Sequence, residues 1–272
     1  MFVFESLEAA RQAVLMRVRS KMFVLLLALI AASGVLYHFV AGEISHEVQG
    51  DEFFGMLATM FLLHFVVPVG VLYLGSVAVH TEIEDRTVNY LFVRPVRRAS
   101  VLVGKWLAVS FLGCAVLLLA LGVLWGTAAL GGHQWQRGVG IEASLVGTFA
   151  MVGCAAVAAY AAAGCAFGAV FRRPIVVALA FYAGWEVAVS HLPPQAGVRG
   201  WTVADPMRRW LYAELQPTGE LRDVLQQGLD RIWLQPEALG DPARTLVWFT
   251  AVMLAWGLWV YCRREYDSRP RD

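Results

Sequence analysis

Charged side chains are scarce in this sequence. Asp, Glu, Lys and Arg make up 16% of its 272 residues, whereas a soluble globular domain usually carries about 25%. Hydrophobic residues account for 58%. The formal net charge is only +1, so the overall charge gives no reason to expect nucleic acid as a partner. This composition argues against an ordinary soluble domain and favours a chain embedded in a membrane.

Cysteine and metal-ligand patterns are also sparse. The four cysteines, Cys114, Cys154, Cys165 and Cys262, all lie inside or at the edge of apolar runs, and no C-x-x-C pair is present. This argues against a zinc site or a redox dithiol. His38, His64 and His191 could be combined with Glu186 as ligands, but no two of them have the i, i+3 or i, i+4 spacing that one helix face requires. We therefore predict no metal site.

Long apolar runs are abundant instead. Six segments approach the ~20 residues that a helix needs to cross a bilayer. They are Met22–Val40, Met56–Val79, Lys105–Leu130, Ser144–Phe171, Pro174–Leu192 and Thr245–Cys262. Because the backbone inside the bilayer must satisfy its own hydrogen bonds, each run is expected to be helical. The sequence thus predicts an all-α polytopic membrane protein whose residues 1–272 form a single transmembrane domain.

Basic residues alternate between the two sides of these spans. One side carries Arg11, Arg17, Arg19, Lys21, Arg86, Arg94, Arg97, Arg98, Lys105, Arg172, Arg173, Arg263, Arg264, Arg269 and Arg271. On the other side, the charged residues of the loop after the first span are all Asp or Glu. The loop after the third span has a single basic residue, Arg137. Basic residues accumulate on the cytoplasmic side of membrane proteins. We therefore expect both termini in the cytoplasm.

Two segments outside the spans have amphipathic patterns. Residues 1–21 place apolar side chains on one helix face and arginines elsewhere, which predicts a helix in the cytoplasmic headgroup layer, in contact with lipid. The long loop 193–243 is external on this topology. Its Leu221, Leu225 and Leu229 mark one helix face, so we expect short interfacial helices there before the last span. The alternative is an ordinary soluble loop.

The segment between the second and third spans, residues 80–105, carries the clearest functional signal. Acidic residues begin it, an apolar periodic run follows, and Pro95 ends it. We predict a short helix over Glu82–Val93 on the cytoplasmic membrane face, with acids at its start favoured by the helix dipole. A second helix is expected to begin near Ser100. On physical grounds alone, a basic loop that only sets orientation is the alternative.

This segment resembles the signature of the type-2 ABC exporter permease family. The matching residues are Glu82, Glu84, Asp85, Thr87, Tyr90, Leu91, Arg94, Pro95, Arg98, Gly104 and Lys105. Arg86 stands where the family often has Gly. The six-span layout is similar too, and Asp205-Pro206 resembles the Asn-Pro of many members. The likeness is greatest to the branch of multi-copper enzyme maturation permeases.

The resemblance implies a non-catalytic permease subunit in the cytoplasmic (inner) membrane of a prokaryote. It implies that Glu82–Val93 is a coupling helix seated on a separate ABC ATPase. The residues expected to couple to that ATPase are Glu82, Glu84, Asp85, Arg86, Thr87, Tyr90, Leu91, Arg94 and Pro95. A second, identical permease copy is expected. The sequence contains no G-x-x-x-x-G-K-[ST] phosphate loop, so we expect no cofactor on this chain and place ATP and Mg on the partner ATPase.

Two polar residues within the spans are candidates for a substrate pathway. Glu186 lies in the fifth span and His64 in the second, and ionisable groups in a bilayer often mark such paths. Gly122-x-x-x-Gly126 and Gly164-x-x-x-Gly168 predict close helix packing, more plausibly within one subunit than across a dimer. The alternatives are an ion-coupled secondary transporter and a membrane enzyme. The sequence does not identify the substrate.

Overall fold

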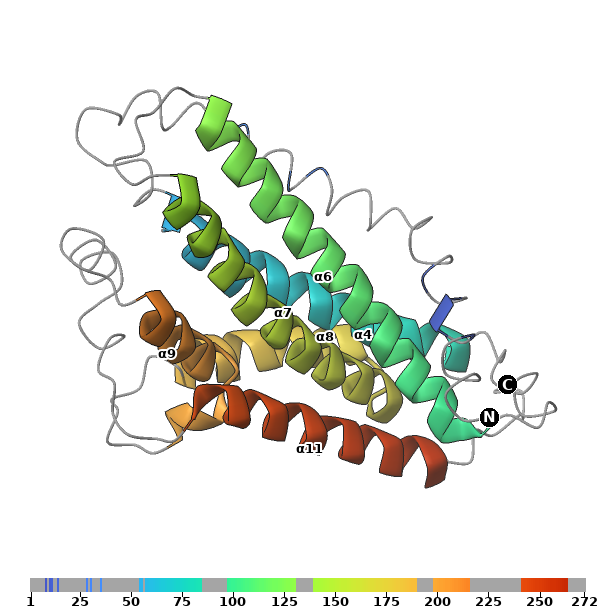
Figure 1. The fold of residues 1–272 in the computed structure, drawn as a ribbon. Coiled ribbons are helices and arrows are strands. Elements are labelled where there is room, and N and C mark those ends of the chain that lie inside the picture. The colour runs from blue at the N-terminus through green and yellow to red at the C-terminus, as the bar shows by residue number, and fades with distance from the viewer. Residues whose placement is uncertain are drawn as a thin grey trace.

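The computed structural model describes residues 57–84, 97–130, 139–189, 198–215 and 241–263, together with scattered positions between residues 8 and 55. All regular structure in these ranges is helical (Figure 1). In chain order the elements are η1 (Ala58–Val66), α4 (Val67–Glu84), α6 (Arg98–Leu130), α7 (Val139–Val170), α8 (Pro174–Ala180), η2 (Phe181–Ala188), η5 (Arg199–Trp201), α9 (Ala204–Leu215) and α11 (Pro242–Arg263). The predicted all-α class is confirmed for this part of the chain.

Four helical runs are long and apolar enough to cross a membrane. They are Ala58–Ile83, Arg98–Thr127, Ser144–Val170 and Pro242–Arg263, and they match the predicted second, third, fourth and sixth spans. The predicted first span falls almost entirely outside the described residues, although Ala28, Ile30 and Val35 within it are helical. The predicted fifth span, Pro174–Leu192, appears as a shorter apolar helix, Pro174–Ala188. Residues 190–192 of the predicted span lie outside the described residues.

Helix α7 lies at the centre of the bundle and packs against α4, α6, α8, α9 and α11 (Figure 1). Its alanines explain this position, because small side chains let neighbouring backbones come close. Ala156, Ala159 and Ala163 are fully buried. The Trp106 indole of α6 donates a hydrogen bond of 3.0 Å to the Ala158 carbonyl of α7.

The closest approach is between α4 and α7, where glycine is required. A Cβ atom added to Gly75 would lie 3.0 Å from the Gly164 Cα atom, and one added to Gly168 would lie 2.5 Å from the Ser76 carbonyl oxygen. The pair Gly164 and Gly168 therefore packs within the subunit, as predicted. By contrast, a Cβ atom added to Gly122 would meet nothing within 4 Å.

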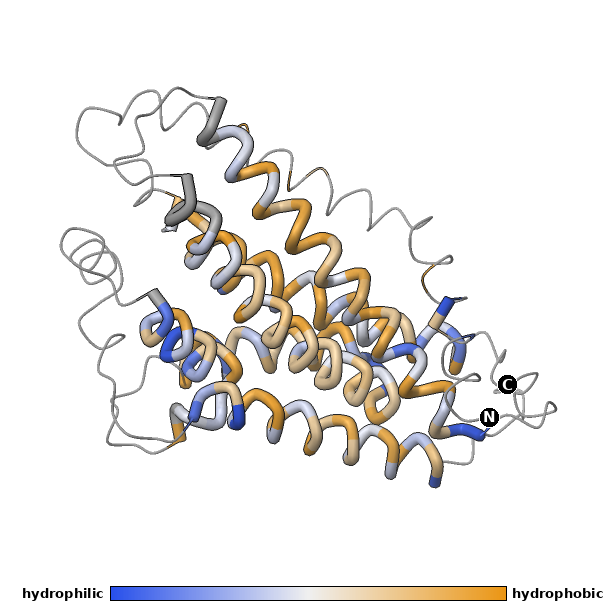
Figure 2. Tube along the Cα trace, in the orientation of Figure 1, coloured by the Kyte–Doolittle hydropathy of each residue, from blue (hydrophilic) through white to orange (hydrophobic). Residues whose placement is uncertain are grey.

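The outward faces of the helices carry large apolar side chains. Those with more than half of their surface exposed include Phe111, Leu119, Val176, Val247, Trp248, Val252 and Trp259. Such a surface is unfavourable in water and suits contact with lipid tails. Figure 2 shows apolar positions along the middle of the helices and hydrophilic positions gathered at both ends.

The two ends of the bundle differ in their charged residues. We call the first the basic end, because Arg97, Arg98, Arg172, Arg173 and Arg263 lie where α6 begins, α7 turns into α8, and α11 ends. The turn there is short, and Pro174 occupies the first position of α8, which its missing N–H suits. We call the opposite end, which holds the start of α9, the α9 end.

Candidate functional site

An ion pair joins the two helices that flank the predicted coupling segment at the basic end. The Lys105 ammonium of α6 pairs with the Glu82 carboxylate on the last turn of α4. Lys105 is 2% exposed and Glu82 19% exposed, so the pair is largely shielded from water. Attraction between charges is stronger in such surroundings, which repays part of the cost of burying them. The pair therefore joins α4 and α6 near the segment that spans residues 85–97.

A second contact fixes the basic end from the side of α11. The Arg98 guanidinium, at the first residue of α6, donates to the Cys262 carbonyl of α11 at 3.4 Å. A cation is favoured at a helix C-terminus, where the last carbonyls are unpaired. Within α11, Arg263 lies 4.9 Å from the centre of the Trp259 ring, within cation–π range. The Lys105–Glu82 pair and the Arg98 hydrogen bond connect the first part of α6 to α4 and to α11.

The expected start of the coupling helix needs correction. We predicted a separate helix from Glu82, but α4 continues to Glu84. Glu82 and Glu84 therefore lie near the C-terminal end of a spanning helix, where its dipole does not favour acids. Pairing with Lys105 offsets that disadvantage for Glu82. The other predicted coupling residues lie outside the described part of the chain: Asp85, Arg86, Thr87, Tyr90, Leu91, Arg94 and Pro95.

At the α9 end, the predicted pathway residue Glu186 is 2% exposed and accepts hydrogen bonds from three groups. The Tyr160 hydroxyl of α7 donates to its Oε2 at 3.0 Å. The backbone N–H of Val203 lies 3.0 Å from Oε1, and that of Ala204 lies 2.9 Å from Oε2. Glu186 therefore has a structural role here, because its three donors connect the Pro174–Ala188 helix to α7 and to the start of α9.

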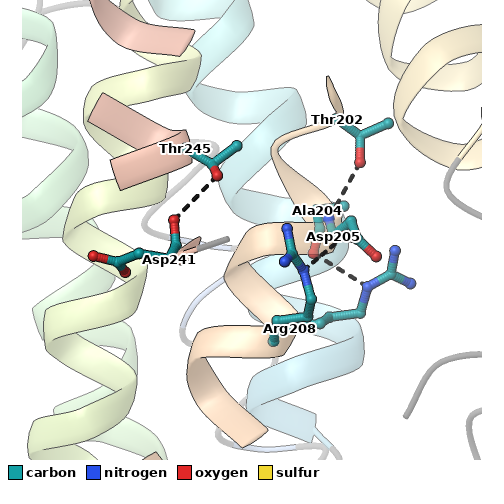
Figure 3. A network of polar contacts seen from close by, with 7 residues as sticks. Thr202, Ala204, Asp205, Arg208, Asp241 and Thr245 are labelled. Atoms are coloured by element: carbon teal, nitrogen blue, oxygen red, sulfur yellow. Dashed lines mark hydrogen bonds and ion pairs between the residues drawn. The ribbon is translucent and has the colours of Figure 1, made fainter. Parts of the chain in front are cut away.

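These bonds cap the first turn of α9. A helix start leaves about four N–H groups without partners in the helix, and Val203 has no side chain that can accept from them. Glu186 accepts hydrogen bonds from two of these N–H groups, and the Thr202 hydroxyl accepts one from the Asp205 N–H at 3.2 Å. Pro206 has no N–H to satisfy. Figure 3 shows Thr202 and Asp205 at this turn.

Charged side chains of α9 reinforce the same turn. Arg208 is 6% exposed, and its Nε donates to the Ala204 carbonyl at 3.1 Å (Figure 3). It also attracts the Glu186 carboxylate electrostatically. Arg209 pairs with Asp205 at 2.9 Å one turn away. Within residues 193–243 the structure thus contains the helix α9, while Leu221, Leu225 and Leu229 lie outside the described residues. The external and interfacial position of this segment stays a prediction.

The second predicted pathway residue, His64, lies on η1 and is half-buried. Its Nδ1 is 2.8 Å from the Thr59 carbonyl oxygen, and its own carbonyl accepts a 2.8 Å bond from the Tyr182 hydroxyl of η2. Tyr182 precedes Glu186 by about one helical turn. The two candidates thus lie on neighbouring π-helical segments, and π-helical turns are frequent at functional sites.

Sequence reasoning missed Tyr160 and the capping role of Glu186. A single tyrosine inside the alanine-rich stretch of residues 155–163 was the available signal, since a buried hydroxyl needs a partner. Among the described residues, no group of three or more His, Cys, Asp and Glu side chains is arranged to hold a metal ion. His38 and His191 lie outside those residues.

Comparison with known proteins gives one family match. Residues 9–207 match the family model described as ABC-2 family transporter protein. This range includes both sites described above, apart from the end of α9. No curated protein matches the chain.

Proposed function

The chain belongs to the ABC-2 transporter family, and from this membership we propose that it is a permease subunit driven by a separate ABC ATPase. As a family member it is a multi-pass membrane component of an ABC transporter. The relation to multi-copper enzyme maturation permeases rests on sequence resemblance alone.

The observation that supports ATPase coupling most is the Glu82–Lys105 pair. A partner that pushes on the segment between α4 and α6 can act on the bundle only if the ends of that segment are fixed. The ion pair and the Arg98 contact with α11 supply this fixation. We propose that Glu82 acts inside the chain, and that Glu84, Asp85, Arg86, Thr87, Tyr90, Leu91, Arg94 and Pro95 face the ATPase.

The remaining parts of the proposal follow from the sequence. Alternation of basic residues supports cytoplasmic termini and a basic end that faces the ATPase. The inner membrane of a prokaryote, contacts with lipid and a homodimer of permeases complete the proposed assembly. ATP and Mg would bind the ATPase, because the 272 residues contain no phosphate-loop motif.

ATP hydrolysis tests this assignment. The purified chain should hydrolyse no ATP alone, and co-expression with its ABC ATPase, sought among the neighbouring genes, should yield a complex in which ATP turnover responds to the permease. A Walker-motif variant of that ATPase is the control for contaminating activity. Turnover by the chain in a preparation free of other subunits would contradict the assignment.

A further inference from the structure

Helix α9 packs against α7 and α11, and hydrogen bonds at Glu186 also connect it to the helical run that starts at the basic end. The helical run Pro174–Ala188 begins at the basic end, directly after the turn at Arg172 and Arg173. It ends beside the first turn of α9, where Glu186 binds the Val203 and Ala204 N–H groups. A displacement of this helix along its axis therefore reaches α9 through Glu186.

The connection at Glu186 is stronger than a packing contact. Its acceptors are buried with their donors, so breaking the bonds would leave two N–H groups and the Tyr160 hydroxyl without this partner in a dry environment. The carboxylate also stands at the positive end of the α9 dipole. The Trp185 indole adds a bond of 3.5 Å to the Trp201 carbonyl just before α9.

We infer that Glu186 is a positioning residue that makes α9 move together with the Pro174–Ala188 helix during the transport cycle. The inference rests on the proposed function, because ATP binding to the partner supplies the motion. In this arrangement Glu186 accepts hydrogen bonds from the start of α9 and from Tyr160. Its role is to carry a displacement that starts at the basic end to the external helix.

A reporter on α9 can measure this motion. Ala213 is exposed on α9, two turns beyond the capped end. An Ala213→Cys variant, in a background with the four native cysteines replaced, is assembled with its ATPase in liposomes. The rate of labelling by a maleimide that cannot cross membranes is then measured without nucleotide and with ATP and vanadate. Transport-coupled ATP hydrolysis is recorded in the same preparation.

The expected result is a change of labelling rate with nucleotide that depends on Glu186. We expect at least about a fivefold change in the parent, the lower range of coupling between distant sites. Glu186→Leu should remove most of that change, while Glu186→Gln, which keeps one acceptor oxygen, should retain part of it. Tyr160→Phe removes one donor only and provides a milder variant if Glu186→Leu fails to assemble.

Two results would overturn the inference. One is the same nucleotide-dependent change in Glu186→Leu as in the parent. The other is a constant labelling rate in a parent that still hydrolyses ATP in a permease-dependent way, because α9 would then be fixed. A merely structural role of Glu186 predicts the first result. Loss of ATP coupling in the parent itself would refute the proposed function, and the inference with it.

Discussion

Glu82 and Lys105 form an ion pair across the base of the segment that joins α4 to α6. Each residue belongs to a different spanning helix, and 22 positions separate them in the sequence. The Lys105 side chain is buried and that of Glu82 is largely shielded from water. The pair gives the basic end a fixed geometry, on which the proposed coupling to an ATPase depends.

Charge exchange tests the importance of this pair. Breaking a buried ion pair from one side typically costs about 3–5 kcal/mol, since the remaining charge is left uncompensated. Glu82→Lys alone and Lys105→Glu alone should therefore lower the thermal stability of the detergent-solubilised chain. The double exchange should recover much of the loss. A double variant no more stable than either single variant would show that the two residues are not coupled.

The close packing of α4 against α7 can be tested by comparing Gly168→Ala with Gly122→Ala. In Gly168→Ala the new methyl group would lie 2.5 Å from the Ser76 carbonyl oxygen, a backbone atom that cannot rotate away. Overpacking of this kind costs about 1–3 kcal/mol. The same change at Gly122 meets open space and should gain up to about 1 kcal/mol from helix propensity.

Thermal unfolding of both glycine variants in one detergent measures the difference. We expect Gly168→Ala to unfold at a lower temperature than the parent and Gly122→Ala at the same temperature or higher. Equal transitions for the two variants would contradict the close approach of the α4 and α7 backbones.

Topology can be tested with single cysteines on both predicted sides. In a background without native cysteines, cysteine at Gln49, Gln136 or Gln216 should react with an impermeant maleimide on intact cells. Cysteine at the exposed position Arg172 should react only after permeabilisation. Reaction at Gln49 only after lysis would overturn the six-span topology.

Most of the long helices could be predicted from the sequence, because the length of an apolar run decides whether it can cross a bilayer. The second, third, fourth and sixth spans were predicted on that basis and are confirmed as membrane-length apolar helices. The Gly164 and Gly168 packing was predicted because small residues at this spacing permit close contact. The predicted fifth span is helical from Pro174 to Ala188, and its last residues, 190–192, lie outside the described part of the chain.

The local roles of polar residues were less accessible from the sequence. Glu82 looked like the start of a new helix because acids favour that position, yet its partner, Lys105, lies on the next helix. Glu186 was predicted as a possible pathway residue because acids are rare in spans, and its role in capping α9 was missed. Both omissions have one cause: the partners of Glu82 and Glu186 are distant in sequence, so no local pattern reveals them.

The proposed function depends above all on binding of the ATPase to the segment after Glu82. Reversing charge in Glu84→Lys, Asp85→Lys should weaken ATPase association, since losing charge-assisted bonds in a protected interface typically costs about 2–5 kcal/mol. Because Glu84 ends α4, a positive charge there suits the helix dipole, so unfolding of α4 is not expected to explain any loss. Glu214→Lys, Glu220→Lys makes the same change of charge on the predicted external side and serves as the control.

The most direct measurement is co-purification of the ATPase with the tagged permease from detergent, normalised to the amount of permease in the membrane. The proposed function predicts normal membrane levels for both double variants, with ATPase recovery strongly reduced for Glu84→Lys, Asp85→Lys and unchanged for Glu214→Lys, Glu220→Lys. Equal ATPase recovery from the parent and from Glu84→Lys, Asp85→Lys would contradict coupling through this segment and leave it as a basic loop that only sets orientation.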